Sequence, residues 1–268
     1  MKRITLAAFG TALAFGALAF GFGAAAQEEG ESAAVGHGVE IAEQDWSWNG
    51  VFGGFDQSQL QRGYLVYEQV CSACHGISLL AFRHLHALGF NTEQVDAIAA
   101  NYPRQVPDID QDTGEPITRP GRAEDRFPAP FPNPVAASFA NGGALPPDLS
   151  VITKARVAGA DYIYALMTGY HEAPEGVNVP DGRYYNAAFV GGVIAMAPPL
   201  SDGMIEYIDG TPNTVDQMSR DVAAFLTWAG EPSLVARKEL GVKVILFLVV
   251  LAGIAYAVKR KVWSDVEH

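Results

Sequence analysis

The stretch from Tyr67 to Ile77, YEQVCSACHGI, contains both cysteines of the 268-residue chain. Cys71 and Cys74 are three residues apart, and His75 directly follows the second. Upstream residues continue this spacing at steps of four and three, which predicts one amphipathic helix that starts after Asp56 and carries Leu60, Tyr64, Tyr67, Cys71 and Cys74 on its buried face. Positions i, i+3 and i+4 share a helix face, so the two thiols and the imidazole are expected to lie together.

Four chemistries use a Cys-x-x-Cys pair, and three of them fit poorly. A disulfide three residues apart closes a very small loop and constrains little. A thioredoxin-like dithiol needs a βαβ setting that the sequence does not show, and a zinc site would lack a fourth ligand. Cys-x-x-Cys-His is the pattern of c-type haem attachment. We therefore predict one covalently bound haem c, with thioethers from Cys71 and Cys74 and with His75 as the proximal iron ligand.

The sixth iron ligand is not fixed by this motif. The candidates are the methionines and histidines of the body: Met167, Met196, Met204, Met218, His84, His86 and His171. Met167 and Met218 lie at helical spacing on apolar faces, which is typical of core packing, and His84 and His86 follow His75 too closely to reach the far face. The loop GGVIAMAPPL favours Met196, with Met204 as the alternative, and a Met ligand raises the haem potential as an electron carrier requires.

Both ends of the chain have membrane-related patterns. Residues 1–26 combine a basic start, an apolar run and a small-residue exit, which predicts a secretory signal peptide. Residues 240–258 are apolar apart from Lys243 and are long enough for a transmembrane helix. Lys and Arg are balanced across that segment, so the signal peptide sets the orientation: 27–239 outside the cytoplasm and 259–268 inside.

The exported body is expected to be mainly α-helical with large irregular Pro-rich insertions. Short helices are predicted over 91–102 and 160–170, and a longer one from Thr211 and Pro212, as N-cap and N1, to Gly230. Residues 103–150 are rich in proline and are predicted to form ordered loop, and 172–203 are again rich in glycine and proline.

The formal net charge of −12 argues against nucleic acid and favours a basic partner. Four acidic residues gather in VPDIDQDTGEP: Asp108, Asp110, Asp112 and Glu115. Their spacing resembles the start of a calcium loop, but Thr113 replaces the required glycine and Arg119 the final glutamate. A solvated acidic loop is favoured, followed by a docking site for a basic partner.

Longer stretches carry a specific resemblance, which covers nearly everything after residue 50. They are RGYLVYEQVCSACH, FRHL, ITRPG, FPAPFPNPVAASFANGGALPPDLSVITKAR, DYIYALMTGY, IAMAPPL, DGTPNT and the C-terminal anchor with KRKVW. With them the chain resembles the cytochrome c1 family, the haem subunit of the ubiquinol–cytochrome c reductase (cytochrome bc1) complex.

The resemblance implies a cytochrome c-like helical haem domain plus one C-terminal transmembrane helix, with Gly63 at the crossing of the cysteine helix and the helix over 213–229. It also implies a role for each matching residue: Cys71 and Cys74 as thioether cysteines, His75 and Met196 as iron ligands, Arg156 at a haem propionate, and Asn141, Pro146 and Pro147 in the haem pocket. Some relatives brace the loop near the methionine with an extra cysteine pair; here packing must hold residues 172–195.

The implied activity is electron transfer within a complex rather than catalysis by the chain alone. One electron would pass from the Rieske iron–sulfur protein to this haem and on to a basic cytochrome c. Cytochrome b and the lipid of a bacterial inner membrane would be further partners, with the haem domain in the periplasm. The rival interpretations are a stand-alone anchored cytochrome, a haem enzyme with an open iron site such as a peroxidase, and a zinc-dependent or disulfide-braced binding domain.

Overall fold

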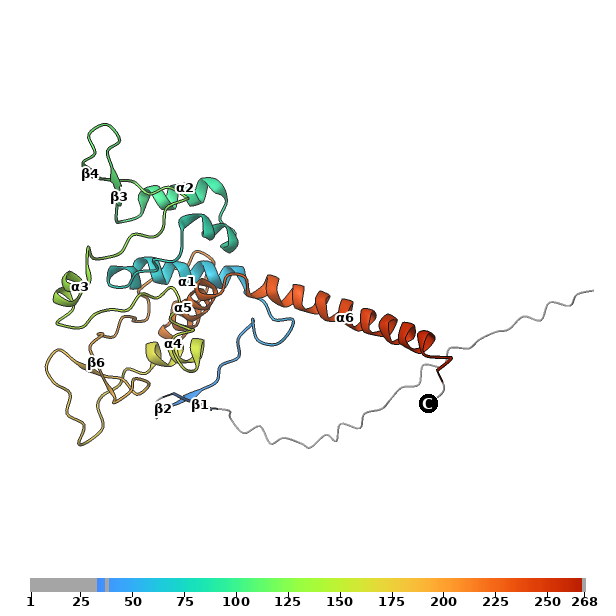
Figure 1. Cartoon of the computed structure of the whole chain (residues 1–268). Helices are drawn as coiled ribbons and strands as arrows, with labels where there is room; N and C mark the ends of the chain where they lie inside the picture. The colour runs from blue at the N-terminus through green and yellow to red at the C-terminus, as the bar shows by residue number, and fades with distance from the viewer. Residues whose placement is uncertain (1–32, 37–38, 267–268) are drawn as a thin grey trace, which may run out of the picture. The chain divides into compact units, whose positions relative to one another are not determined.

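The computed structural model describes residues 33–36 and 39–266 (Figure 1). The predicted signal peptide, residues 1–26, lies outside the described residues. The helices are α1 (Gln57–Gln69), α2 (Thr92–Asn101), α3 (Pro134–Ala140), α4 (Gly159–Thr168), α5 (Val215–Gly230) and α6 (Leu234–Val262), with 3-10 turns η1 (Cys71–Ala73) and η2 (Phe82–Leu88). Short antiparallel ladders pair β1 (Ala33–Gly36) with β2 (Val39–Ala42), β3 (Val106–Ile109) with β4 (Pro116–Arg119), and β5 (Tyr184–Tyr185) with β6 (Val193–Ile194). The predicted mainly α fold is confirmed.

The crossing of α1 and α5 forms the centre of the core (Figure 1). Gly63 lies where the helices meet, because a Cβ there would stand 2.0 Å from the Asp221 carbonyl oxygen and 2.7 Å from Phe225 Cβ. The rings of Tyr64 and Tyr67 on α1 both lie 5.7 Å from that of Phe225. The predicted close crossing at Gly63 is therefore confirmed.

The predicted start of α1 and the predicted end of α4 match the structure, whereas the predicted start of α5 does not. Asp56 caps α1 by accepting hydrogen bonds from the backbone N–H groups of Ser58 and Gln59, and α4 ends at Gly169. The prediction that α5 begins at Thr211 is wrong. Its cap is Thr214, whose hydroxyl accepts from the Gln217 N–H at 3.2 Å.

The segment before Thr214 is kept out of the helix by its own hydrogen bonds. Asn213 Nδ2 donates to the Ile205 carbonyl at 2.6 Å, and the Val215 N–H donates to the Asp202 carboxylate at 2.7 Å. These long-range partners fix the backbone at the position where a Thr-Pro pair alone predicts a helix start.

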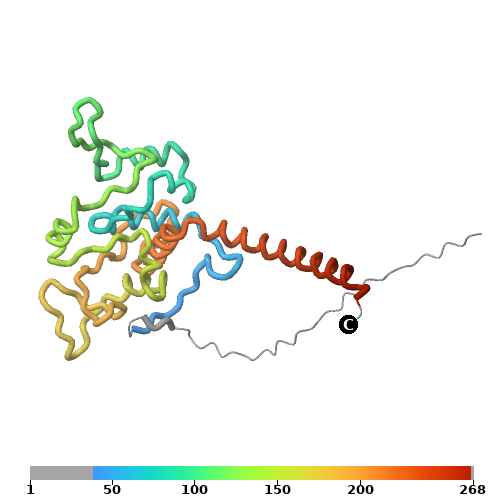
Figure 2. Tube along the Cα trace, viewed as in Figure 1, coloured from blue at the N-terminus to red at the C-terminus, as the bar shows by residue number. Residues whose placement is uncertain are grey.

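The Pro-rich stretch 103–150 has more regular structure than predicted. It contains the β3–β4 hairpin and the short helix α3, and Figure 2 follows it in green from the hairpin to α3. The Asp110 carboxylate caps the hairpin turn by accepting from the N–H groups of Asp112 and Thr113. Pro107 and Pro116 interrupt the strand alternation in the sequence, which explains why the pattern predicts only loop.

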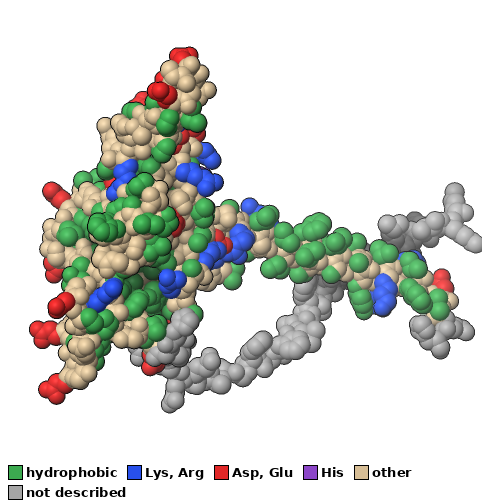
Figure 3. Space-filling model, turned by 60° about the vertical axis from the view of Figure 1, so that its left-hand side comes forward, with side chains coloured by type: hydrophobic (Ala, Val, Ile, Leu, Met, Phe, Trp, Pro, Cys, Tyr) green, Lys and Arg blue, Asp and Glu red, His purple; other side chains and the backbone are tan. Residues whose placement is uncertain are grey.

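The predicted membrane span 240–258 lies within α6, which follows α5 after three residues. Among the described residues, α6 is the one helix long and apolar enough to cross a membrane, with a mean hydropathy of 2.4. Its apolar side chains are exposed along its length (Figure 3). The base of α6 is attached to the body, since Lys238 Nζ donates to the carbonyl oxygens of Trp48 and Gly50.

Candidate haem site

The two cysteines lie in a tight turn rather than in a helix. The prediction that α1 runs through Cys74 is wrong, because α1 ends at Gln69 and residues Cys71–Ala73 form η1. The Ser72 hydroxyl donates to the Glu68 carbonyl at 2.7 Å, and the N–H groups of Cys74 and His75 both donate to the Cys71 carbonyl. The turn still presents two thiols and an imidazole within five residues.

Both thiols are free and half-buried. Burial raises the pKa of the Cys71 thiol to about 12, so this group is neutral at physiological pH. A thiol can add across a vinyl group so that sulfur bonds to one carbon and hydrogen to the other. The pair therefore suits thioether formation with a divinyl macrocycle.

His75 is oriented by a segment seventy residues downstream. Its Nδ1 lies 2.8 Å from the Pro147 carbonyl oxygen. Burial lowers the pKa of His75, although the Pro147 carbonyl and the nearby Asp148 carboxylate oppose this shift. A neutral imidazole that donates through Nδ1 keeps the lone pair of Nε2 for a metal, which is the usual arrangement of a ligating histidine.

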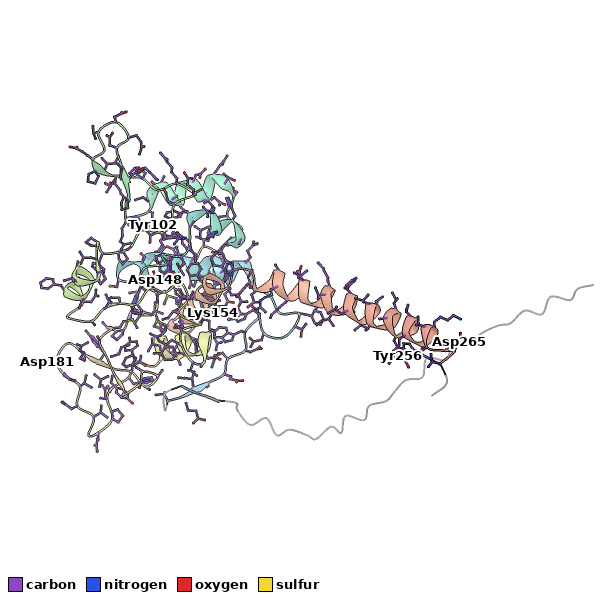
Figure 4. All side chains as sticks on the ribbon, viewed as in Figure 1. Tyr102, Asp148, Lys154, Asp181, Tyr256 and Asp265 are labelled. Carbon is purple, nitrogen blue, oxygen red and sulfur yellow. The ribbon has the colours of Figure 1, made fainter. Side chains whose placement is uncertain are left out.

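We call Cys71–His75 the attachment turn. Asp148, labelled in Figure 4, connects the segment around Pro147 to the residues that follow this turn. Its carboxylate accepts from the N–H groups of Ser78 and Ser150, at 2.9 and 2.8 Å. The Leu149 N–H donates to the Gly76 carbonyl at 2.7 Å. Sequence spacing does not indicate this role of Asp148, because Ser78 is remote from it in the chain. The result is that Pro147 is held against His75.

Met196 lies beside a tyrosine from the end of α4. The Tyr170 hydroxyl donates to the Met196 carbonyl at 3.0 Å. The Arg156 guanidinium is exposed and donates to the Ala155 carbonyl. The hydrogen bond from Tyr170 fixes the backbone at Met196, and the role of Arg156 at a propionate remains a prediction.

Asn186 closes the loop that precedes Met196, and no sequence pattern indicates this role. Its side chain is fully buried, donates to the Leu166 carbonyl at 2.8 Å and accepts from the Ala188 N–H at 3.0 Å. Its backbone N–H donates to the Gly192 carbonyl at 2.9 Å. These contacts attach the loop of residues 172–195 to α4 without a cysteine pair.

Replacing Asn186 with alanine is expected to lower the free energy of unfolding by about 2 kcal/mol, since two buried backbone groups lose their partners. Denaturant unfolding of the solubilised protein measures this. Asn178→Ala is the matched control, because Asn178 is exposed in the same loop. Equal free energies of unfolding for the two variants would show that Asn186 does not stabilise the attachment of this loop to α4.

The other candidate ligands have different environments. Met218 is fully buried in the core, and the partly buried Met167 packs against the core, as predicted for both. Met204 is half exposed. His84 Nδ1 accepts from the Ala81 N–H, and His86 Nδ1 lies 3.0 Å from the Phe90 carbonyl oxygen. Both histidines are therefore engaged in local contacts at η2.

Asn141 is also engaged locally, because its side-chain amide donates to the Ala137 carbonyl at the end of α3. Its role in lining the pocket, like that of Pro146, remains a prediction.

The acidic hairpin has no arrangement that suggests a bound cation. Asp108 pairs with Arg119, and Asp110 caps the turn. Across residues 39–266, no three His, Cys, Asp or Glu side chains gather in a group that could hold a metal. The solvated-loop interpretation accounts for these contacts.

The attachment turn and its surroundings fit a haem. Two free thiols, an imidazole with a free nitrogen and a methionine in a nearby loop are the donor types that would hold an iron porphyrin covalently.

Comparison with known proteins gives consistent matches. Residues 46–266 match the family described as "Cytochrome C1 family". The chain is 45% identical over 284 residues to "Cytochrome c1" of Rhodospirillum rubrum, covering 100% of this chain and 98% of that protein. It is 47% identical over 229 residues to "Cytochrome c1-2, heme protein, mitochondrial" of Solanum tuberosum, covering 85% of this chain and 87% of the relative.

A third relative has a longer chain. "Cytochrome b/c1" of Bradyrhizobium diazoefficiens is 48% identical over 242 residues, which cover 82% of this chain and 35% of that protein. The extent of these matches, over nearly all of the described body and its apolar helix, shows that the chain belongs to the cytochrome c1 family.

Proposed function

We propose that this chain is the membrane-anchored, mono-haem c-type cytochrome of a quinol–cytochrome c reductase (cytochrome bc1 complex). It would receive one electron from the Rieske iron–sulfur protein and pass it to a cytochrome c. The observation that carries this proposal is the Cys71–His75 turn with its imidazole held on the Pro147 carbonyl. The name of the Bradyrhizobium relative, which joins cytochrome b and c1, supports cytochrome b as a partner.

Each residue of the site has a distinct task. Cys71 and Cys74 would attach the haem, His75 and Met196 would hold the iron, and the Pro147 carbonyl fixes the imidazole ring. The bound haem supplies a one-electron ferric/ferrous couple. The Tyr170 hydroxyl holds the Met196 backbone, so the thioether is placed without a covalent brace. No bond of a substrate is made or broken by this chain.

We infer that the haem domain, residues 27–239, lies in the periplasm and that α6 crosses the inner membrane of a bacterium. The exposed apolar surface of α6 supports this placement. The tail 259–268 would then lie in the cytoplasm, where Lys259, Arg260 and Lys261 face the anionic leaflet.

Purification from membranes tests the proposal. The chain is expected to copurify with cytochrome b and Rieske subunits, and a quinol is expected to reduce its haem only when the Rieske cluster is present. A haem protein that purifies without other subunits and is not reduced by quinol would favour the stand-alone cytochrome instead.

Electron transfer to a basic cytochrome c is expected to slow by roughly tenfold or more when ionic strength rises from about 0.01 M to about 0.15 M, because screening suppresses steering. The acidic hairpin is a candidate docking surface. Asp112→Asn with Glu115→Gln should weaken this salt dependence, whereas Glu172→Gln with Glu175→Gln in the distant loop is the control. A rate that is indifferent to salt would argue against electrostatic docking.

A further inference from the structure

The loop that leads from β2 into α1 exposes two neighbouring apolar side chains. Val51 is 62% exposed and Phe52 is 90% exposed. An aromatic and an aliphatic side chain that stand together in water lose the free energy that burial would supply. Contiguous apolar side chains on a surface are typical of contacts with a partner or a membrane.

The loop is closed by its own hydrogen bonds, so the exposure of its tip is a fixed feature of the fold. The Asn49 N–H donates to the Trp46 carbonyl at 2.9 Å, and the Gly54 N–H donates to the Ser47 carbonyl at 3.0 Å. The rings of Trp46 and Trp48 are buried and stack with centroids 4.8 Å apart. The two tryptophans therefore attach the loop to the body, while its tip remains uncovered.

The same loop is joined to the base of α6. Lys238 Nζ donates to the carbonyl oxygens of Trp48 and Gly50, at 2.5 and 2.6 Å. A Cβ on Gly54 would stand 3.7 Å from Cγ2 of Val235. Figure 1 shows the loop, in blue, beside the first turns of α6. The exposed tip is thus continuous with the exposed apolar surface of the helix.

The attachment to Lys238 sets the depth of the loop. Lys238 precedes the apolar span 240–258 by two residues, which is a rise of roughly 3 Å along the helix axis. When α6 spans a bilayer, the loop therefore lies at the level of the lipid headgroups. Aromatic and aliphatic side chains insert at this level, where they bury apolar surface among the upper parts of the lipid chains.

Basic side chains lie at the same depth. Figure 3 shows Lys and Arg side chains where α6 leaves the body. Neither Lys238 nor Lys243 forms an ion pair with a carboxylate within residues 39–266. Lysines beside an apolar surface at this level are suited to the phosphate groups of lipids.

We propose that Val51 and Phe52 insert into the bilayer surface as a second membrane contact beside α6, with lipid phosphates at Lys238 and Lys243. This inference rests on the proposed span of α6. The continuity of the tip with the apolar surface of α6 favours lipid over a protein as the occupant. A second contact would restrict tilting of the haem domain about its single helix and so hold the domain at a fixed height above the membrane.

Spin labelling of the full-length protein in membranes tests the inference. A nitroxide is attached to Phe52→Cys, the protein is reconstituted with its copurifying subunits into phosphatidylcholine–phosphatidylglycerol vesicles, and collisions with oxygen and with a water-soluble nickel chelate are measured. Unmutated protein treated with the same label supplies the background. The label is expected to be accessible to oxygen and protected from nickel, because oxygen concentrates in lipid and the chelate stays in water.

Two control positions calibrate the result. Leu248→Cys places the label on the exposed surface of α6 within the span, and Asn178→Cys places it in the exposed loop 172–195 of the body. Position 52 should resemble position 248 and differ from position 178. Val51→Cys is the second variant, and it decides where Phe52→Cys does not accumulate.

The remaining outcomes each overturn a distinct statement. A label at position 52 that meets nickel as readily as position 178 would show that the tip lies in water, and this would refute the inference. An immobilised label that meets neither reagent would show that a protein covers the tip, which would also refute it. Nickel access at position 248 as well would overturn the proposed span of α6, on which the inference rests.

Discussion

Met196→Leu is expected to lower the midpoint potential of the haem by a large part of the ~0.8 V range over which axial ligands set haem potentials. Leucine has similar volume but no donor atom, so packing is nearly conserved and ligation is lost. A thioether stabilises ferrous iron, and its removal favours the ferric state. The variant should also lose the near-infrared charge-transfer band of a Met–iron bond in its oxidised spectrum.

Met204→Leu is the matched control for this prediction. Met204 is half exposed and was the sequence-based alternative to Met196. Its replacement should leave the potential and the band unchanged. If Met204→Leu lowers the potential and Met196→Leu does not, the ligand assignment is wrong.

Gly63→Ala is expected to lower the free energy of unfolding by about 3 kcal/mol, the upper part of the usual range for overpacking a core. The new methyl group would stand 2.0 Å from the Asp221 carbonyl oxygen, and backbone atoms cannot yield as a flexible side chain can. The gain of about 1 kcal/mol in helix propensity from glycine to alanine does not offset this clash. Denaturant unfolding of the detergent-solubilised protein gives the value.

Gly241→Ala provides the control for Gly63→Ala. Gly241 also lies within a helix, and a Cβ there would meet nothing within 4 Å. Its replacement should be neutral or slightly stabilising. Wild-type stability in Gly63→Ala would mean that α1 and α5 are farther apart than the structure places them.

Local sequence signals predicted the elements whose stability is local. Asp56 caps α1 and Asn91 caps α2 with side-chain hydrogen bonds to the next turn, so residue type and spacing suffice to find them. The close crossing at Gly63 was predictable, because a glycine within a helix leaves room for another backbone to approach. The heptad-like spacing through Cys71 and Cys74 predicted too long a helix, since it could not reveal the Ser72–Glu68 hydrogen bond at its end.

The resemblance implies that Pro147 lies in the haem pocket, but the contacts that hold the site join distant segments and do not follow from residue spacing. Pro147 reaches His75 across seventy-two positions, and the Asp148 carboxylate accepts from Ser78 across seventy. Asn186 satisfies backbone groups of α4 and of its own loop. Residue spacing within one segment contains no information on such pairs, whereas the Cys-x-x-Cys-His motif is contiguous and was visible at once.

Spectroscopy is the first experiment to make on the proposal that Cys71, Cys74, His75 and Met196 hold one covalent haem. Pyridine-haemochrome spectra after acid-acetone extraction, together with the oxidised near-infrared spectrum, should be recorded on the full chain from membranes. We expect a c-type haemochrome that resists extraction, one haem per chain, and a Met–iron charge-transfer band. Haem that is removed by extraction, or a protein without haem, would contradict this proposal.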